Sequence, residues 1–186
     1  WAPSYDIIRE SFIPLLAAMG LEVEVTLHRY GFFPAGGGNV TGVIRPFHRE
    51  SPFMEFLERG AAGGLSAEAV ISRLPRSIAE RELLTIQQTL GRSIQDLSIK
   101  EITNAPGPGN VVMIRATYGN ITHVFTAFGM KGKKAETVAM EACREFLRFA
   151  DSGAALDEHL ANQLLLYLAL RGGGVLSVPA ISRHTA

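Results

Sequence analysis

Apolar side chains recur at helical spacing near the start of the chain and then alternate with polar ones. Over residues 3–19 they fall three or four positions apart, and Gly20 stands where a helix would end. Pro14 lies inside this pattern, and we expect it to kink the helix because proline lacks a backbone donor. The alternation that follows predicts strands over residues 21–30 and 39–45, joined by a glycine-rich turn.

The middle of the chain, residues 47–130, has a pattern of its own. Its predicted elements are a strand over 67–74, a helix over 76–90 and three strands over 94–102, 111–118 and 122–128. Short runs that contain proline, glycine or asparagine separate the last three strands. One helix with several strands favours a small α+β insert over a repeat of the flanking pattern.

The last segment of the chain is predicted to be mostly helical. Two helices are expected over residues 135–150 and 156–170, and a short strand over 175–178. The outer segments therefore combine helices and strands as an α/β domain that the middle segment interrupts. We expect residues 1–46 and 131–186 to be the two parts of this split domain.

The composition is that of a globular protein without excess charge. Of its 186 residues 47% are hydrophobic, and 18 Lys and Arg balance 18 Asp and Glu. No global field would attract nucleic acid or a membrane surface, so any nucleic-acid contact has to be local. No apolar run reaches the roughly 18 residues that a membrane span needs. The only cysteine, Cys143, has no partner for an internal disulfide, so we expect a cytoplasmic protein.

Glycine-rich and lysine-rich runs each leave two interpretations open. The glycines at 36–38 join two predicted strands and precede no helix, which favours a tight turn over an anion-binding loop. Residues 129–134, GMKGKK, precede a predicted helix, and a solvated helix start is favoured over a phosphate-binding role. The five histidines show no paired spacing and have no cysteine companions, so no metal site is predicted among them.

The helix predicted over residues 156–170 carries two polar residues in an apolar run. Asn162 and Gln163 interrupt it, and a core-facing amide has to find hydrogen-bond partners. The pair therefore marks either a helix edge or the wall of a polar pocket. Periodicity alone does not choose between them.

Four short motifs, taken together and in their order, resemble the RNA 3′-terminal phosphate cyclase family. They are residues 29–38 (RYGFFPAGGG), 105–110 (APGPGN), 159–163 (HLANQ) and 182–185 (SRHT). Their spacing agrees with the family along nearly the whole chain. One such motif would carry little weight, but four in sequence are specific.

The resemblance implies a fold and an activity. The family fold is a large split domain of repeated helix–helix and β-sheet units, related in architecture to the enolpyruvyl transferases, with a smaller thioredoxin-like insert. The implied activity converts an RNA 3′-phosphate into a 2′,3′-cyclic phosphodiester with ATP and a divalent cation, Mg²⁺ or Mn²⁺. A histidine is adenylylated on the way, and His184 matches it.

The resemblance also implies an ATP site. Pro3 matches a proline that lies against the adenine, and an ATP-contacting run is matched by His159, Leu160, Ala161, Asn162 and Gln163. Two positions depart from the family, which usually has an aromatic residue at the place of His159 and an aspartate at that of Asn162. The first departure keeps a flat ring for stacking, and the second loses a charge.

Two other functions remain open at this point. A branch of the same family is a non-catalytic factor of ribosome assembly, and it tends to lack the histidine that His184 matches. An enolpyruvyl-transferase-type enzyme would share only the architecture. The chain starts at Trp1 without an initiator Met and stops at Ala186 without a polar tail, so we expect a fragment with little or no turnover alone.

Overall fold

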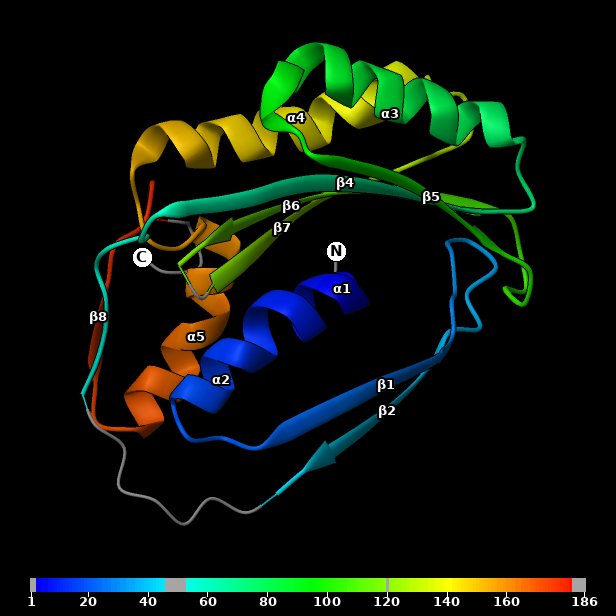
Figure 1. Cartoon of the computed structure of the whole chain (residues 1–186). Coiled ribbons are helices and arrows are strands. Elements are labelled where there is room, and N and C mark those ends of the chain that lie inside the picture. Colours follow the sequence, from blue (N-terminus) through cyan, green and yellow to red (C-terminus); the bar gives the residue numbers. More distant parts are fainter. Residues whose placement is uncertain (1–2, 46–52, 120, 182–186) are drawn as a thin grey trace.

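The computed structural model describes residues 3–45, 53–119 and 121–181, and it has the mixed α/β fold that the sequence predicts. Its largest sheet has four strands in the order β5-β4-β6-β7 (Figure 1). These strands are β4 (Ala62–Ser72), β5 (Asp96–Ile102), β6 (Gly109–Tyr118) and β7 (Ile121–Phe128). Strands β4 and β5 are parallel, whereas β6 is antiparallel to both of its neighbours.

Two helices, α3 (Arg76–Leu90) and α4 (Ala135–Ser152), cover one face of this sheet (Figure 1). Both bury an apolar stripe against it, and Cys143 of α4 is fully buried there. Helix α4 shares one hydrophobic core with α3 and the sheet. The division of the chain into residues 1–46, 47–130 and 131–186 stays a prediction.

The N-terminal helix lies on the opposite face of the sheet (Figure 1). It runs through α1 (Tyr5–Ile7), a π-helical turn η1 (Ile8–Phe12) and α2 (Ile13–Ala18). Pro14 is the second residue of α2, two positions after the end of the π-helical turn. A π-helical turn shifts the hydrogen-bond register of a helix. The shift occurs in the turn that precedes Pro14, whose backbone has no N–H group to donate a hydrogen bond.

Two smaller strand pairs complete the fold. Strands β1 (Val23–Arg29) and β2 (Asn39–Ile44) form the predicted antiparallel hairpin, below the N-terminal helix in Figure 1. Strand β3 (Met54–Phe56) pairs in parallel with β8 (Gly174–Leu176). The sequence did not predict β3, because a three-residue strand is too short to show periodicity.

The last helix, α5 (Glu158–Leu170), packs against the N-terminal helix. Leu160 and Leu164 of α5 meet Leu15 and Leu16 of α2 in one buried cluster. Two segments more than 140 positions apart in the sequence are thereby fixed side by side. Within the described residues, no helix is both long and apolar enough to cross a bilayer.

Candidate functional site

A cavity of about 460 Å³ lies where the start of the chain, α4 and the N-terminus of α5 meet. It brings together four of the residues predicted to contact ATP, namely Pro3, His159, Leu160 and Gln163. Its wall also contains Pro179, which precedes the predicted nucleophile by five positions. Gln163 therefore belongs to a cavity wall, one of the two alternatives that periodicity left open.

The other predicted site residues lie elsewhere. Ala161 is buried in the core between α5 and α2 and lines a different cavity, near residues 173–181. Asn162 is half-buried on α5. His184 lies outside the described residues, and its role as nucleophile stays a prediction.

Asp157 fixes the helix end that carries His159. Its carboxylate accepts hydrogen bonds from the backbone N–H groups of His159 at 3.0 Å and Leu160 at 2.9 Å, which is a standard N-terminal cap. Burial raises the pKa of Asp157, but hydrogen bonds from His123 and the Leu160 backbone outweigh it, so the pKa lies below 3.8. The charged cap holds the His159 side chain, which is 74% exposed, at the cavity.

His123 supports this cap from the four-stranded sheet. Its Nδ1 atom lies 3.3 Å from Oδ2 of Asp157, and its ring is fully buried against Phe149, with ring centroids 4.3 Å apart. His123 is on β7 and Asp157 caps α5, so the four-stranded sheet and the predicted ATP-binding helix are in direct polar contact. Sequence analysis missed this pair because neither residue belongs to a recognisable motif.

Two arginines of α4 differ in their availability to an anion in the cavity. Arg148 is paired with Glu158 at 2.7 Å and with Glu145 at 3.3 Å. Arg144 also lines the cavity and is exposed, and no described carboxylate lies within ion-pair distance of it. Arg144 is therefore the cation that can bind phosphate without first breaking an ion pair. Its position on a solvated helix face gave no signal in the sequence.

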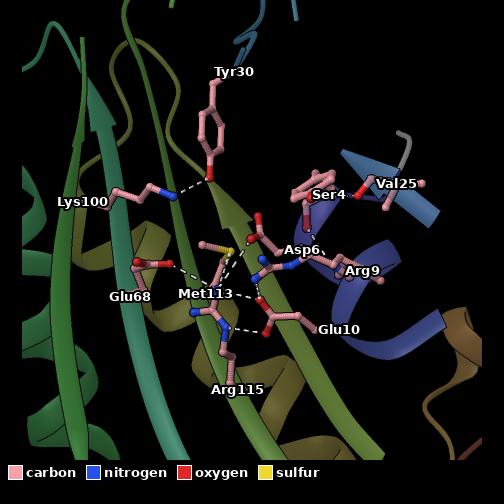
Figure 2. Close-up of polar contacts among 12 residues, drawn as sticks. Ser4, Asp6, Arg9, Glu10, Val25, Tyr30, Glu68, Lys100, Met113 and Arg115 are labelled. Carbon is pink, nitrogen blue, oxygen red and sulfur yellow. Dashed lines mark hydrogen bonds and ion pairs between the residues drawn. The ribbon is translucent and has the colours of Figure 1, made fainter. Parts of the chain in front are cut away.

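A cluster of charged residues holds the N-terminal helix on the sheet (Figure 2). Arg115 of β6 meets Glu10 at 2.7 Å, Glu68 at 3.2 Å and Asp6 at 3.6 Å. Burial raises the pKa of Asp6 above 3.8 even though Arg115 lowers it. Because Pro3 stands just before this helix, the cluster helps to fix one wall of the cavity.

The described residues offer no evident metal centre. No group of three or more His, Cys, Asp and Glu side chains among them is arranged to hold a metal ion. Accordingly, no metal ligand is assigned in this cavity.

The sequence matches the RNA 3′-terminal phosphate cyclase family over residues 1–186. It is 41% identical over 183 residues to the RNA 3′-terminal phosphate cyclase of Koribacter versatilis, covering 98% of this chain and 51% of that protein. Proteins with the same name from Pseudomonas aeruginosa and Ralstonia nicotianae are 40% and 37% identical over 183 residues. These alignments cover 98% of this chain and 53% and 52% of the two relatives. The chain thus spans about half the length of these proteins.

Proposed function

The chain belongs to the RNA 3′-terminal phosphate cyclase family, and from this premise we propose that it is the ATP-binding part of an RNA 3′-phosphate cyclase. The full-length protein would convert an RNA 3′-phosphate into a 2′,3′-cyclic phosphodiester. Relatives are about twice as long, so the 186 residues alone are expected to have little or no turnover. A cytoplasmic location also belongs to this proposal.

The observation that carries the proposal is the convergence of Pro3, His159 and Gln163 on one cavity. These residues come from opposite ends of the chain, and the resemblance had assigned all three to ATP. Pro3 and the exposed imidazole of His159 offer two flat surfaces to an adenine ring. The Gln163 amide can hydrogen-bond to the edge of the base. Arg144 offers an uncompensated charge to the phosphates.

In the proposed reaction, the neutral imidazole of His184 attacks the α-phosphorus of ATP. A nitrogen–phosphorus bond forms, the bond to the β-phosphate oxygen breaks, and pyrophosphate leaves. An oxygen of the RNA 3′-phosphate then attacks the phosphorus of the bound AMP, the nitrogen–phosphorus bond breaks, and the histidine is released. The neighbouring 2′-hydroxyl loses its proton to solvent and attacks the RNA 3′-phosphorus, which closes the cyclic diester as the bond to AMP breaks and AMP leaves.

Negative charge develops on the phosphates in these steps and has to be neutralised. A divalent cation, Mg²⁺ or Mn²⁺, supplies such neutralisation when it is bound. Among the described residues, Arg144 is suited to assist. The neutral Asn162 stands where the family has a carboxylate, so a role that needs a negative charge at this position is not proposed.

The test is to incubate the full-length protein with Mg²⁺ and ATP labelled in the α-phosphate. We expect covalent AMP on the parent protein and none on His184→Ala. His28→Ala is a matched control, because His28 is an exposed histidine on β1 that contacts Thr41, and it should keep the label. Undiminished labelling of His184→Ala would contradict the proposal.

Two further outcomes distinguish the alternatives. A full-length protein that takes no label and does not cyclise RNA would fit the non-catalytic factor of ribosome assembly. Binding of a small phosphorylated metabolite without labelling would fit an enolpyruvyl-transferase-type enzyme.

A further inference from the structure

Three sequence motifs that play no part in the proposed ATP site meet at a second cavity, of about 640 Å³. Its wall contains residues 29–34 of the first glycine-rich motif and residues 109–111, at the end of the second. Residues 128–131, which include the start of the lysine-rich run, and residues 3–6 also line it. These segments are far apart in the sequence, so only the fold brings them together.

The glycines of these motifs serve loop packing. A Cβ atom at Gly31 would lie 2.3 Å from the backbone nitrogen of Gly38, and one at Gly109 would lie 1.9 Å from the Phe32 ring. Both distances are shorter than any real contact, so each position needs glycine for the loops to approach. In the run at 36–38, Gly36 and Gly37 have φ values of 64° and 73°, and the Gly36 N–H donates a hydrogen bond of 2.7 Å to the Phe32 carbonyl, which favours the tight-turn interpretation. Recognition in this cavity falls to its side chains.

The side chains of the second cavity are rich in aromatic rings. Its lining includes Tyr5, Tyr30, Phe32, Phe33 and Phe128. Tyr30 and Phe32 are stacked, with centroids 6.2 Å apart and an angle of 9° between the rings. Phe33 is 79% exposed. Large exposed rings in a cavity can stack on the flat face of a nucleobase.

The charge of the lining is positive. Arg29 and Lys131 are exposed, and no described carboxylate lies within ion-pair distance of either. Arg29 is held in place by a hydrogen bond that its Nε donates to the Gly37 carbonyl at 2.7 Å. Among the described residues of the lining, Asp6 is the one that carries a carboxylate, and Arg115 lies 3.6 Å from it. Two available cations beside aromatic rings suit a phosphodiester strand.

The two cavities are neighbours, because Pro3 and Phe128 line both of them. We propose that the second cavity binds a nucleobase and the adjoining phosphate of the single-stranded 3′ end of RNA. This proposal rests on the proposed function, since the RNA end has to approach the bound nucleotide to receive AMP. It also supplies the local RNA contact that a chain without net charge requires.

The experiment uses the full-length protein and a fluorescent single-stranded RNA with a 3′-phosphate, with binding followed by anisotropy. Stacking on one ring predicts that Phe33→Ala weakens RNA binding by about 5-fold to 100-fold. Lys131→Ala should weaken it less and should lower the slope of log Kd against log salt by about one. Labelling by ATP, which needs no RNA, is measured in parallel and should stay within about twofold.

Matched controls lie outside the cavity. Phe53 is an exposed aromatic residue and Lys134 a lysine of the same run, and neither lines the cavity. Phe53→Ala and Lys134→Ala should bind RNA as the parent does. RNA binding by Phe33→Ala and Lys131→Ala at the parent's level would overturn the proposal, as would an equal loss of RNA binding and ATP labelling. The parent protein could also bind RNA, lose that binding in Phe33→Ala and Lys131→Ala, and yet take no AMP label. That result would count against the proposed function but not against the RNA cavity.

Discussion

The side-chain amide of Asn110 donates a hydrogen bond of 2.8 Å to Oε2 of Glu82, and both side chains are buried. The other carboxyl oxygen of Glu82 has no hydrogen-bond partner among the described residues. Burial raises the pKa of Glu82 from 4.5 to about 7, against the opposing effect of Asn110. Asn110 also lines the proposed RNA cavity. The Glu82 carboxyl therefore lies directly behind the wall of that cavity.

Glu82→Gln should make the protein more stable above neutral pH. The pKa of Glu82 is raised in the folded state. The neutral carboxyl therefore does not lower the free energy of unfolding below pH 4.5, whereas its ionisation lowers that free energy as the pH rises through about 7. Glutamine keeps the acceptor for Asn110 without the charge, and we expect a gain of up to about 3 kcal/mol at pH 8. Urea unfolding at pH 5 and pH 8 measures it. The exposed Glu80→Gln is the control, and a gain that is equal at both pH values would contradict the assignment.

Arg115→Met should destabilise the protein by about 3 kcal/mol, because three partly buried carboxylates would face one another without their cation. Adding Glu10→Gln should recover part of the loss. Chemical denaturation of the full-length protein gives both values. In contrast, Arg81→Met removes an exposed pair with Glu136 and should change stability by less than about 1 kcal/mol. Equal losses in the two arginine variants would show that the cluster has no special role.

Asp157→Ala should lower the free energy of unfolding by about 1–2 kcal/mol, since it removes the cap of α5. It should also weaken ATP binding, because His159 stands in the first turn of that helix. The Asp157 pKa is lowered, so its stabilising effect is present above pH 3.8 and is lost as the pH falls below that value. The variant should therefore lose less stability than the parent between pH 5 and pH 3.

Thermal unfolding across this pH range tests the Asp157 prediction. Asp151→Ala is its control, because Asp151 is an exposed aspartate in the last turn of α4 and caps no helix start. A stability profile of Asp157→Ala that runs parallel to that of the parent would count against the charged cap.

Arg144→Ala should raise the KM for ATP by about tenfold, which corresponds to the loss of one charge-assisted hydrogen bond to phosphate. Arg148→Ala should have a smaller effect, because Glu158 and Glu145 already compensate that charge. Initial rates of AMP labelling at varied ATP concentration compare the two variants. The reverse order of effects would remove Arg144 from the phosphate site.

Local patterns were enough to predict most elements of this fold. Helix α3 is observed at Arg76–Leu90, where helical spacing and a following glycine predicted it. The β1–β2 hairpin was equally visible from alternation and a glycine-rich turn. Spacing of apolar residues reports the exposure of each face of an element, which is a local property. The motifs indicate the family, and through that resemblance they predict Pro3, His159 and Gln163 as ATP contacts.

Only the tertiary structure decided which distant segments meet. The core shared by α3 and α4, the contact of Arg115 with Glu10 and the contact of His123 with Asp157 join residues from 34 to 105 positions apart. An isolated charged or polar residue looks alike in the sequence whether it faces solvent or a partner. Its role depends on how sheets and helices pack over long separations, and neither periodicity nor a short motif encodes that arrangement. The chain's own pattern therefore specified its elements and its family, whereas packing decided which charges are paired and which remain available to a ligand.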